Sequence, residues 1–174
     1  MTEALVVTGI GVVSAIGQGK LAFGEALLRG DSAFGIMQRP GRQRDSAFIG
    51  AEMRDVVLPA TVPPQLLRTA SLSAVAALAV VQEAWDESRL ADVAPERVGL
   101  IVGGSNLQQR ELVLAQEAYR DRAAFLRPSY AMTFMDTDLC GLCTSQFGIR
   151  GIAMTAGAAS ASGQMAIVQA AQAV

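Results

Sequence analysis

Apolar residues follow two kinds of pattern along the chain. Residues 98–102, with the sequence Val-Gly-Leu-Ile-Val, form an unbroken apolar run between turn residues, which is typical of a strand buried on both faces of a parallel sheet. Between residues 66 and 88, large apolar side chains recur at helical spacing with small residues between them, so we expect a helix that packs closely against its neighbours. Together these patterns favour an α/β fold in which helices cover a mainly parallel sheet.

The remaining elements are predicted from apolar spacing and from the Gly and Pro residues that interrupt it. Strands are expected at residues 4–8 and near Ala153, and helices at residues 20–29, 109–123, 135–147 and 161–174. Residues 30–64 are rich in Gly, Arg, Asp and Pro and are expected to form an extended loop with short strands. The last helix has no terminating Gly, Pro or basic turn, so we expect the fold to continue in a part that this chain lacks.

The most informative segment runs from residue 154 to residue 167, where a β-prone stretch breaks at small residues and resumes as an apolar helix. Ser160 lies at that turn. The amino terminus of a helix stabilises developing negative charge, so a side chain at this place is well presented for chemistry. The structural alternative is that Ser160 caps a helix beginning at Ala161, a position where serine is favoured.

Three motifs in order give this turn a family resemblance. The chain opens with Val-Val-Thr-Gly-Ile-Gly-Val-Val-Ser-Ala-Ile-Gly at residues 6–17, continues through residues 98–104, and reaches Phe-Gly-Ile-Arg-Gly at residues 147–151. This combination resembles the amino-terminal half of a β-ketoacyl synthase of the thiolase superfamily. In that family a Thr-Ala-Cys-x-Ser-Gly stretch follows, and its acyl-carrying cysteine falls here on Ser160, with Ser162 matching the serine after it.

A further resemblance is to the ketosynthase-like decarboxylases that work beside trans-acting polyketide assembly lines. It is carried by Phe-Met-Asp-Thr-Asp at residues 134–138 and by Gly-Ala-Ala-Ser-Ala-Ser-Gly at residues 157–163. Those proteins have serine at the place of Ser160, and the resemblance implies conversion of malonyl-carrier protein to acetyl-carrier protein in polyketide biosynthesis, for β-branching by a hydroxymethylglutaryl-synthase-like partner. It also implies that no cofactor is bound directly, since the substrate is carried on the phosphopantetheine of an acyl carrier protein.

The same resemblance implies a layered thiolase-like fold of which residues 1–174 form only the amino-terminal half. In the family, the carboxyl-terminal half carries two histidines that bind the thioester carbonyl and a lysine that supports them. This chain contains no histidine, so the resemblance predicts a carboxyl-terminal partner half. It further implies a two-fold dimer of the assembled protein, with an interface near residues 130–135.

Elementary chemistry narrows the part that Ser160 can play. A serine hydroxyl is a poor nucleophile without an adjacent base, and a helix amino terminus stabilises an anion by only about 1 kcal/mol, too little to ionise serine. Decarboxylation needs only a malonyl thioester whose carboxylate leaves in an apolar pocket while donors meet the enolate oxygen. We therefore expect Ser160 to be a hydrogen-bond donor or a water-positioning group, with its backbone N–H contributing to an oxyanion hole.

Four neighbours complete the predicted site. Ser105 and Asn106 follow the strand predicted at residues 98–102, and the carboxyl ends of parallel strands carry function in α/β sheets. Ala161 and Ser162 follow Ser160 directly in the chain. We expect these four residues to bind substrate.

Two other functions fit parts of the pattern. The first is a non-catalytic subunit like the chain-length factor of a two-subunit polyketide synthase, in which the cysteine is also absent and the protein shapes a partner's tunnel. The second is a serine hydrolase or acyltransferase, but its Gly-x-Ser-x-Gly elbow requires glycine where this chain has Ala158 and Ser162. A partner half with His-Gly-Thr and Asn-His motifs would favour the decarboxylase over both.

Composition argues against several kinds of partner. The net charge is −2 with acidic and basic residues mixed, which gives no electrostatic footprint for nucleic acid or an anionic membrane. No apolar run approaches the ~20 residues of a membrane span, and the start lacks the basic region of a signal peptide, so we expect a cytoplasmic protein. Arg39, Arg42 and Arg44 form either a local basic patch for an acidic carrier protein or a solvated loop.

Three further motifs have alternative interpretations. Cys140 and Cys143 have a redox or zinc spacing, but the chain has no histidine and no other cysteine, so we interpret both as packing residues. The glycines around residue 10 lack the third glycine and the acidic partner of a dinucleotide site. Asp136 and Asp138 are candidates for general acid or base chemistry, although residues two apart on a helix point about 200° apart, so one is expected to be a cap or an interface residue.

Overall fold

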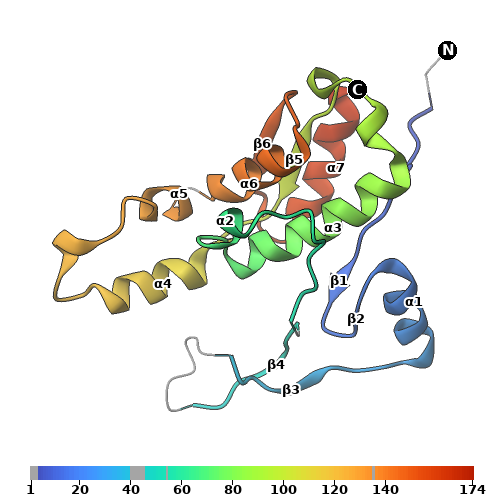
Figure 1. Ribbon diagram of the computed structural model, residues 1–174. Coiled ribbons are helices and arrows are strands. Elements are labelled where there is room, and N and C mark those ends of the chain that lie inside the picture. Colours follow the sequence, from blue (N-terminus) through green and yellow to red (C-terminus); the bar gives the residue numbers. More distant parts are fainter. Residues whose placement is uncertain (1–3, 40–45, 54, 135) are drawn as a thin grey trace.

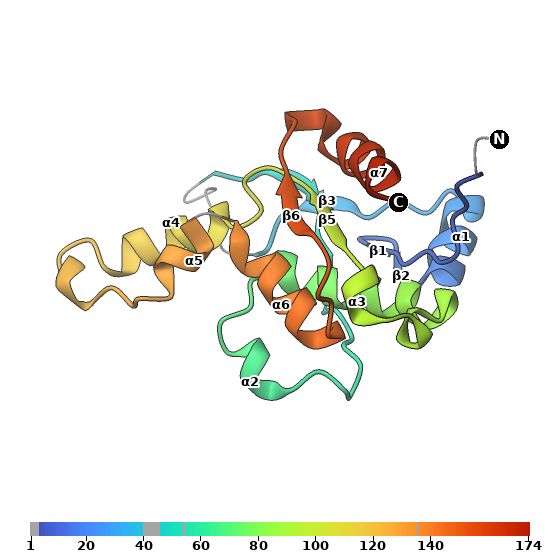
Figure 2. The same ribbon diagram turned by 90° about the horizontal axis from the view of Figure 1, so that it is seen from above.

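The centre of the molecule is a parallel pair of strands with helices on both sides. The computed structural model describes residues 4–39, 46–53, 55–134 and 136–174 (Figure 1). Strand β5 (Leu100–Gly103) pairs in parallel with β6 (Ala153–Ala156). Helix α7 (Ser162–Ala173) packs on one side of this pair, and α6 (Thr137–Phe147) and α3 (Leu72–Ser88) lie on the other (Figure 2). The predicted α/β class, with helices on both faces of parallel strands, is confirmed.

Close packing of α7 on β5 depends on one small residue. A β-carbon at Gly103 would lie 2.5 Å from the carbonyl oxygen of Ser162 and 2.8 Å from the Cα of Gly163. On the opposite face of the strand, Leu100 and Val102 pack into the main core, as the two-residue period of a strand requires. The end of β5 is therefore pressed directly against the start of α7.

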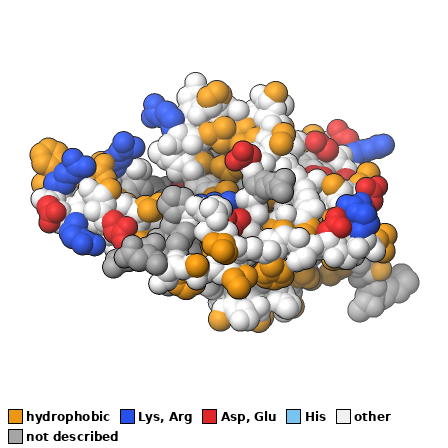
Figure 3. All heavy atoms as spheres, turned by 90° about the horizontal axis from the view of Figure 1, so that it is seen from below, with side chains coloured by type: hydrophobic (Ala, Val, Ile, Leu, Met, Phe, Trp, Pro, Cys, Tyr) orange, Lys and Arg blue, Asp and Glu red, His pale blue; other side chains and the backbone are white. Residues whose placement is uncertain are grey.

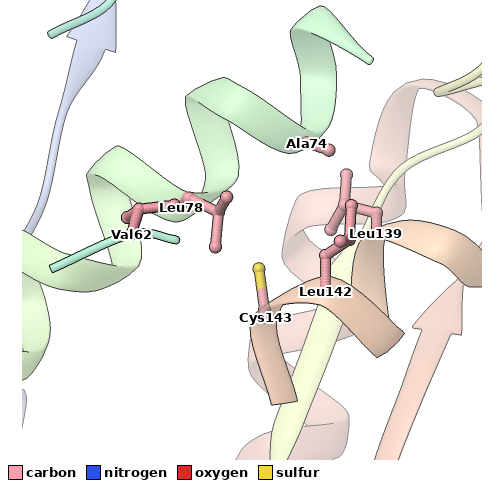
Figure 4. Packing of buried hydrophobic residues seen from close by; sticks show 6 residues of the cluster. All are labelled: Val62, Ala74, Leu78, Leu139, Leu142 and Cys143. Atoms are coloured by element: carbon pink, nitrogen blue, oxygen red, sulfur yellow. The ribbon is translucent and has the colours of Figure 1, made fainter. Parts of the chain in front are cut away.

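The core forms where α3 crosses α6 (Figure 4). The buried cluster consists of Val62, Ala74, Leu78, Leu139, Leu142 and Cys143. Leu78 and Cys143 are fully buried and point toward each other from the two helices. The small side chain of Ala74 lets the helices approach, and the rings of Trp85 and Phe147, with centroids 5.1 Å apart, extend the contact toward one end.

The helix predicted at residues 66–88 is divided in two. A short helix α2 (Pro64–Leu67) ends first, and α3 begins only at Leu72. The side chain of Ser71 causes the restart, because its hydroxyl accepts the backbone N–H of Ala74 at 3.0 Å and so caps α3. The predicted burial of this helix is confirmed by its core residues.

Two further helices differ from their predicted bounds. Helix α4 (Gln109–Ala118) ends five residues before the predicted position 123, and a 3₁₀ turn η3 (Ala123–Phe125) follows it. Helix α5 (Tyr130–Phe134) precedes α6, and Asp136 separates them in a left-handed conformation with φ 53°. Helices α4 and α5 project from the body as an arm (Figures 1 and 2).

The strand predicted at residues 4–8 is wrong, because these residues join no ladder. A strand needs a neighbouring strand for its hydrogen bonds. The backbone of the residues that follow, 10 and 12, bonds to carboxylates of α3 instead. The backbone N–H of Ile10 donates to Glu87 at 2.8 Å, and that of Val12 donates to Glu83 at 2.9 Å. The side chains of Val6 and Val7 stay 76% and 80% exposed.

The rest of the amino-terminal region agrees with its predicted character. Helix α1 (Lys20–Arg29) has the predicted bounds and ends at Gly30, which is left-handed with φ 73°. Before α1, β1 (Val13–Ser14) and β2 (Gly17–Gln18) form an antiparallel ribbon, and β3 (Phe34–Ile36) and β4 (Ile49–Ala51) form another in the predicted loop. Within the described ranges, no helix is long and apolar enough to cross a membrane.

Candidate active site

The ends of β5 and β6 bring two loops together. The backbone N–H of Gly104 donates to the carbonyl of Ala156 at 3.1 Å, one step beyond the last paired residues of the strands. The hydroxyl oxygens of Ser105 and Ser162 lie 3.3 Å apart, although the residues are separated by 57 positions. The structure therefore places two of the predicted site residues in contact at the carboxyl edge of the strands.

Ser162 is the centre of the turn that leads into α7. Its side chain is buried, and its hydroxyl donates to the carbonyl of Ala159 at 2.7 Å while accepting the backbone N–H of Ala158 at 2.9 Å. A serine hydroxyl has one proton, so the hydroxyl of Ser105 must be the donor in the Ser105–Ser162 contact. Ser162 holds the shape of the turn, and it could reach a substrate only by giving up one of these bonds.

Ser160 lies on the exposed side of the same turn, within the 3₁₀ segment η4 (Ala159–Ala161). The interpretation of Ser160 as the cap of a helix starting at Ala161 is wrong, because α7 starts at Ser162 after Ala161, and no side chain caps it. The Ser160 hydroxyl makes no hydrogen bond within the described part of the chain. Its exposure leaves it available to a ligand or to another part of the protein.

Backbone strain shapes this turn. Ala159 has φ 48°, a left-handed conformation that costs a non-glycine residue roughly 1–2 kcal/mol. The two hydrogen bonds of Ser162 flank that residue and compensate for the strain. Ser160 and Ala161 therefore project from a turn whose geometry is fixed by buried bonds.

Asn106 faces a different part of the molecule. It is left-handed, with φ 58°, and lines an open groove of about 700 Å³ between α4 and the β3–β4 ribbon. Ser160 and Ala161 do not line that groove. Asn106 is thus adjacent in sequence to the Ser105–Ser162 contact, but the described chain does not bring it together with Ser160.

Asp136 supplies a contact that the sequence does not reveal. Its carboxylate accepts the backbone N–H groups of Leu107 at 3.1 Å and Gln108 at 2.9 Å, where α4 begins. Asp136 stands at the N-cap position of α6 but caps no N–H of that helix, and the two N–H groups that it accepts belong to the loop just before α4. That one of the two aspartates is a cap or an interface residue stays a prediction. The second aspartate, Asp138, is partly buried, and burial raises the pKa of its carboxyl above the ordinary value of 3.8.

The two cysteines belong to the core, as predicted. Both are buried on α6, and Cys143 is part of the main cluster. Burial, with a smaller effect of Cys140, raises the pKa of the Cys143 thiol to about 12. Such a thiol stays protonated and is a poor nucleophile. Sequence and structure agree that the pair packs rather than reacts.

The predicted basic patch at residues 39–44 lies largely outside the described residues, and two other arginines line a hollow on the arm. Arg42 and Arg44 lie outside the described residues, and Arg39 donates to the carbonyl of Met53 at 2.6 Å. A hollow of about 310 Å³ at the base of the arm is lined by Arg68, Thr69, Glu111, Ala115, Tyr119, Leu126, Arg127, Ser129, Tyr130, Thr133 and Asp138. Arg68 and Arg127 are exposed there, and neither has an ion pair within the described residues. Figure 3 shows basic and acidic side chains gathered on the arm, at the left.

The class of protein is settled by a comparison with protein families. Residues 2–174 match the model of the β-ketoacyl synthase, N-terminal domain. The chain belongs to the β-ketoacyl synthase family, which confirms the resemblance carried by the three sequence motifs.

One relative is similar along almost the whole chain. The polyketide biosynthesis malonyl-ACP decarboxylase PksF of Bacillus subtilis (strain 168) is 53% identical over 170 residues, which is 98% of this chain. This chain spans 41% of the length of that protein.

Solved structures confirm the fold. The crystal structure of a β-ketoacyl synthase from Burkholderia phymatum STM815 superposes with a TM-score of 0.72 at 18% identity, covering 95% of this chain and 42% of that one. The AntDE:AntF complex of a type II polyketide synthase acyl-carrier protein with its ketosynthase gives a TM-score of 0.70 at 22% identity, covering 97% of this chain and 46% of that one. The predicted thiolase-like layered fold is therefore confirmed.

Proposed function

We propose that the full-length protein decarboxylates malonyl-carrier protein to acetyl-carrier protein in polyketide biosynthesis. The observation that carries this proposal is the 53% identity to a malonyl-ACP decarboxylase over 98% of the chain. The malonyl unit is held as a thioester on the phosphopantetheine of an acyl carrier protein, and the enzyme itself needs no further cofactor.

The reaction breaks one carbon–carbon bond and forms none. The bond between the malonyl carboxylate and the α-carbon breaks, carbon dioxide leaves, and the electron pair forms a thioester enolate. The α-carbon then takes up one proton to give the acetyl thioester. The barrier falls when hydrogen-bond donors meet the enolate oxygen in a site with little water.

The exposed turn at Ser160 is the part of this chain that we assign to that chemistry. Its hydroxyl is unbonded within the described residues, and its backbone lies in the 3₁₀ turn directly before α7, near the helix end where a developing anion is favoured. We propose that Ser160 donates a hydrogen bond or positions water, and that its backbone N–H contributes to the oxyanion hole. Ser105, Ala161 and Ser162 are proposed to shape the substrate site at this turn, and the substrate contact predicted for Asn106 is proposed at the separate groove beside α4.

The remaining donors are proposed to come from outside residues 1–174. The chain has no histidine and spans 41% of its decarboxylase relative. We propose that residues 1–174 form the amino-terminal half of the synthase domain, and that a carboxyl-terminal half supplies the groups that hold the thioester carbonyl. We further propose a two-fold dimer of the assembled protein in the cytoplasm, with an interface near residues 130–135, of which Met135 lies outside the described residues.

The hollow at the base of the arm is the proposed contact for the carrier protein. Guanidinium groups bind phosphate and carboxylate well, since their N–H donors match two acceptor oxygens. Arg68 and Arg127 offer two such groups without an ion pair among the described residues, next to the hydroxyls of Thr69 and Ser129. The acidic Glu111 and Asp138 on the same lining would restrict where an anion can sit.

Carbon dioxide release tests the proposal directly. The full-length protein is incubated with malonyl-carrier protein, and carbon dioxide and the mass of the carrier are followed. We expect release of carbon dioxide with acetyl-carrier protein as product and no condensation product. Ser160→Ala should slow release if the hydroxyl takes part, whereas Ser145→Ala, an exposed serine of α6, should not. A protein that binds malonyl-carrier protein and releases no carbon dioxide would instead support a chain-length-factor role.

A further inference from the structure

The junction between α5 and α6 holds a carboxylate that serves a distant loop. Asp136 is left-handed there, and its side chain caps no N–H of its own helix α6. Its two oxygens instead accept the backbone N–H groups of Leu107 and Gln108, 29 and 28 positions earlier. Hydrogen bonds from backbone N–H groups to a charged carboxylate are stronger than those to a neutral acceptor. The loop between β5 and α4 is therefore fixed at its far end by one side chain.

The same residue also contacts the second strand. The hydroxyl of Thr155, on β6, donates to the main-chain carbonyl of Asp136 at 3.4 Å and lies 3.4 Å from the sulfur of Cys140. Asp136 thus bonds to the loop after β5 with its side chain and to β6 with its backbone. It links the two segments that lead into the candidate site.

A chain of hydrogen bonds continues from that loop to the turn of Ser160. Ser105 lies two residues before Leu107, and its hydroxyl donates to that of Ser162. Ser162 in turn bonds to the backbone on both sides of the strained residue Ala159. Hydrogen bonds join Asp136 to Leu107 and Ser105 to Ser162, and the chain itself joins Leu107 to Ser105, so a displacement of the loop is transmitted to the turn.

We propose that Asp136 is a positioning residue that holds the Ser160 turn in place through Ser105. This inference rests on the proposed function for its effect on rate. Asp136 touches no reacting atom in this scheme. It sets where the Ser160 hydroxyl and backbone N–H stand relative to the thioester, and small displacements of such groups slow an enzyme strongly.

Asp136→Asn is the sharpest test because it removes one acceptor oxygen and the charge while keeping the size of the side chain. Asparagine has the same shape and tolerates the left-handed backbone, but it offers one acceptor oxygen, and its amide group would meet the second N–H as donor against donor. Asp92→Asn, on an exposed turn away from the site, is the matched control. Both changes are made in the full-length protein, with Ser105→Ala as a second variant that breaks the same chain of bonds at its other end.

Two measurements separate positioning from general stability. In Asp136→Asn, kcat for carbon dioxide release should fall about ten-fold, while KM for malonyl-carrier protein stays unchanged. Backbone amide exchange of residues 157–163 should speed up in Asp136→Asn and in Ser105→Ala, but not in Asp92→Asn. The double variant Asp136→Asn with Ser105→Ala should lose no more kcat than the single variant with the larger loss, because both act through one path.

Three outcomes would overturn the positioning role. They are unchanged exchange at residues 157–163, additive losses of kcat in the double variant, and loss of stability with normal kcat in the folded fraction. If Asp136→Asn does not fold, Ser105→Ala decides the matter by the same exchange and kcat measurements. If the wild-type protein releases no carbon dioxide, the proposed function fails, while the exchange measurement still decides whether Asp136 holds the turn.

Discussion

The serine hydroxyl at residue 160 limits the chemistry that the turn can do. A thiol near a helix amino terminus ionises readily, whereas a serine hydroxyl needs a strong base close by. The described structure places no such base in contact with Ser160. This favours a donor role over an acyl-carrying role for the side chain.

Introducing a thiol at residue 160 should therefore allow acylation. We expect Ser160→Cys in the full-length protein to become covalently acylated, because a thiolate at the start of α7 would be stabilised there. Intact mass spectrometry after incubation with acetyl-carrier protein would detect the added acetyl group. Ser145→Cys, on the exposed face of α6, controls for non-specific modification. Equal acylation at both positions would show that the turn does not activate its nucleophile.

Asp138 should lower stability at neutral pH. Burial raises the pKa of its carboxyl above 3.8, so the unfolded chain ionises first, and the folded state loses stability as the pH rises through the folded pKa. Asp138→Asn is expected to raise the melting temperature at neutral pH and to give no gain well below pH 3.8. Asp92→Asn should show neither effect. A lower melting temperature for Asp138→Asn at neutral pH would mean that the charge has a favourable partner.

For single residues, the sequence predicted where site residues lie in the fold better than it predicted which side chains bond to one another. The rule that function lies at the carboxyl ends of parallel strands placed Ser105 near Ser162, and their hydroxyls are 3.3 Å apart. It could not predict that Asp136 binds the loop before α4, 28 residues away, because such a bond depends on how distant elements pack. Local spacing carries no signal for a bond of that kind.

Among the elements, those whose signal is local were predicted well. Helix α1 has the predicted bounds because Gly30 ends it through its own backbone preference. The helix at residues 66–88 was divided because Ser71 caps α3 from inside an apolar pattern. The strand at residues 4–8 failed for a different reason, since a strand exists only with a hydrogen-bonded neighbour and the described chain offers it none.

Carboxylates of α3, and not a neighbouring strand, bond to the amino-terminal segment. The attachment of this segment to α3 should therefore depend on pH. Hydrogen bonds from Lys20 and from the backbone of Ile10 hold the pKa of Glu87 below its ordinary 4.5. Its contribution to stability is therefore fully present above pH 4.5 and is lost as the pH falls through the folded pKa.

Replacing that carboxylate tests the attachment. Glu87→Gln should speed amide exchange at residues 10–12 at neutral pH, and the difference from wild type should vanish well below pH 4.5. Glu25→Gln is the control, because its carboxylate is 3.9 Å from Arg29 and far from this segment in sequence. A difference that persists in acid would assign the attachment to groups other than the Glu87 charge.

At the scale of the whole molecule, many large apolar side chains of the described residues are exposed to solvent. Val6, Val7 and Ile167 are each more than 70% exposed, and Leu28 is 91% exposed. Hydrophobic side chains also gather along one edge of the face drawn in Figure 3. Soluble proteins rarely leave large apolar patches open to water, which supports the proposal that a second half of the synthase domain covers this chain.

Expression of residues 1–174 with and without the remainder of the protein tests that proposal. Alone, the chain should self-associate or precipitate. Together with the remainder, it should form a stable assembly of defined mass in light scattering. A monodisperse and stable monomer of 18.2 kDa would contradict the need for a second half.

The hollow at the base of the arm leads to a prediction about carrier recognition. If Arg68 and Arg127 bind anionic groups of the carrier protein, charge reversal should weaken association and leave the chemistry intact. We expect Arg68→Glu and Arg127→Glu to raise KM for malonyl-carrier protein with little change in kcat. Exposed Arg97→Glu, outside the hollow, is the control.

A small substrate separates docking from catalysis at that hollow. Malonyl-pantetheine lacks the protein part of the carrier, so its turnover should be the same in wild type, Arg68→Glu and Arg127→Glu. Added salt should weaken wild-type turnover of malonyl-carrier protein more than that of the variants, because screening removes an attraction that they no longer have. If both substrates lose rate equally in the variants, the arginines act on the chemistry or the fold, and the carrier protein docks elsewhere.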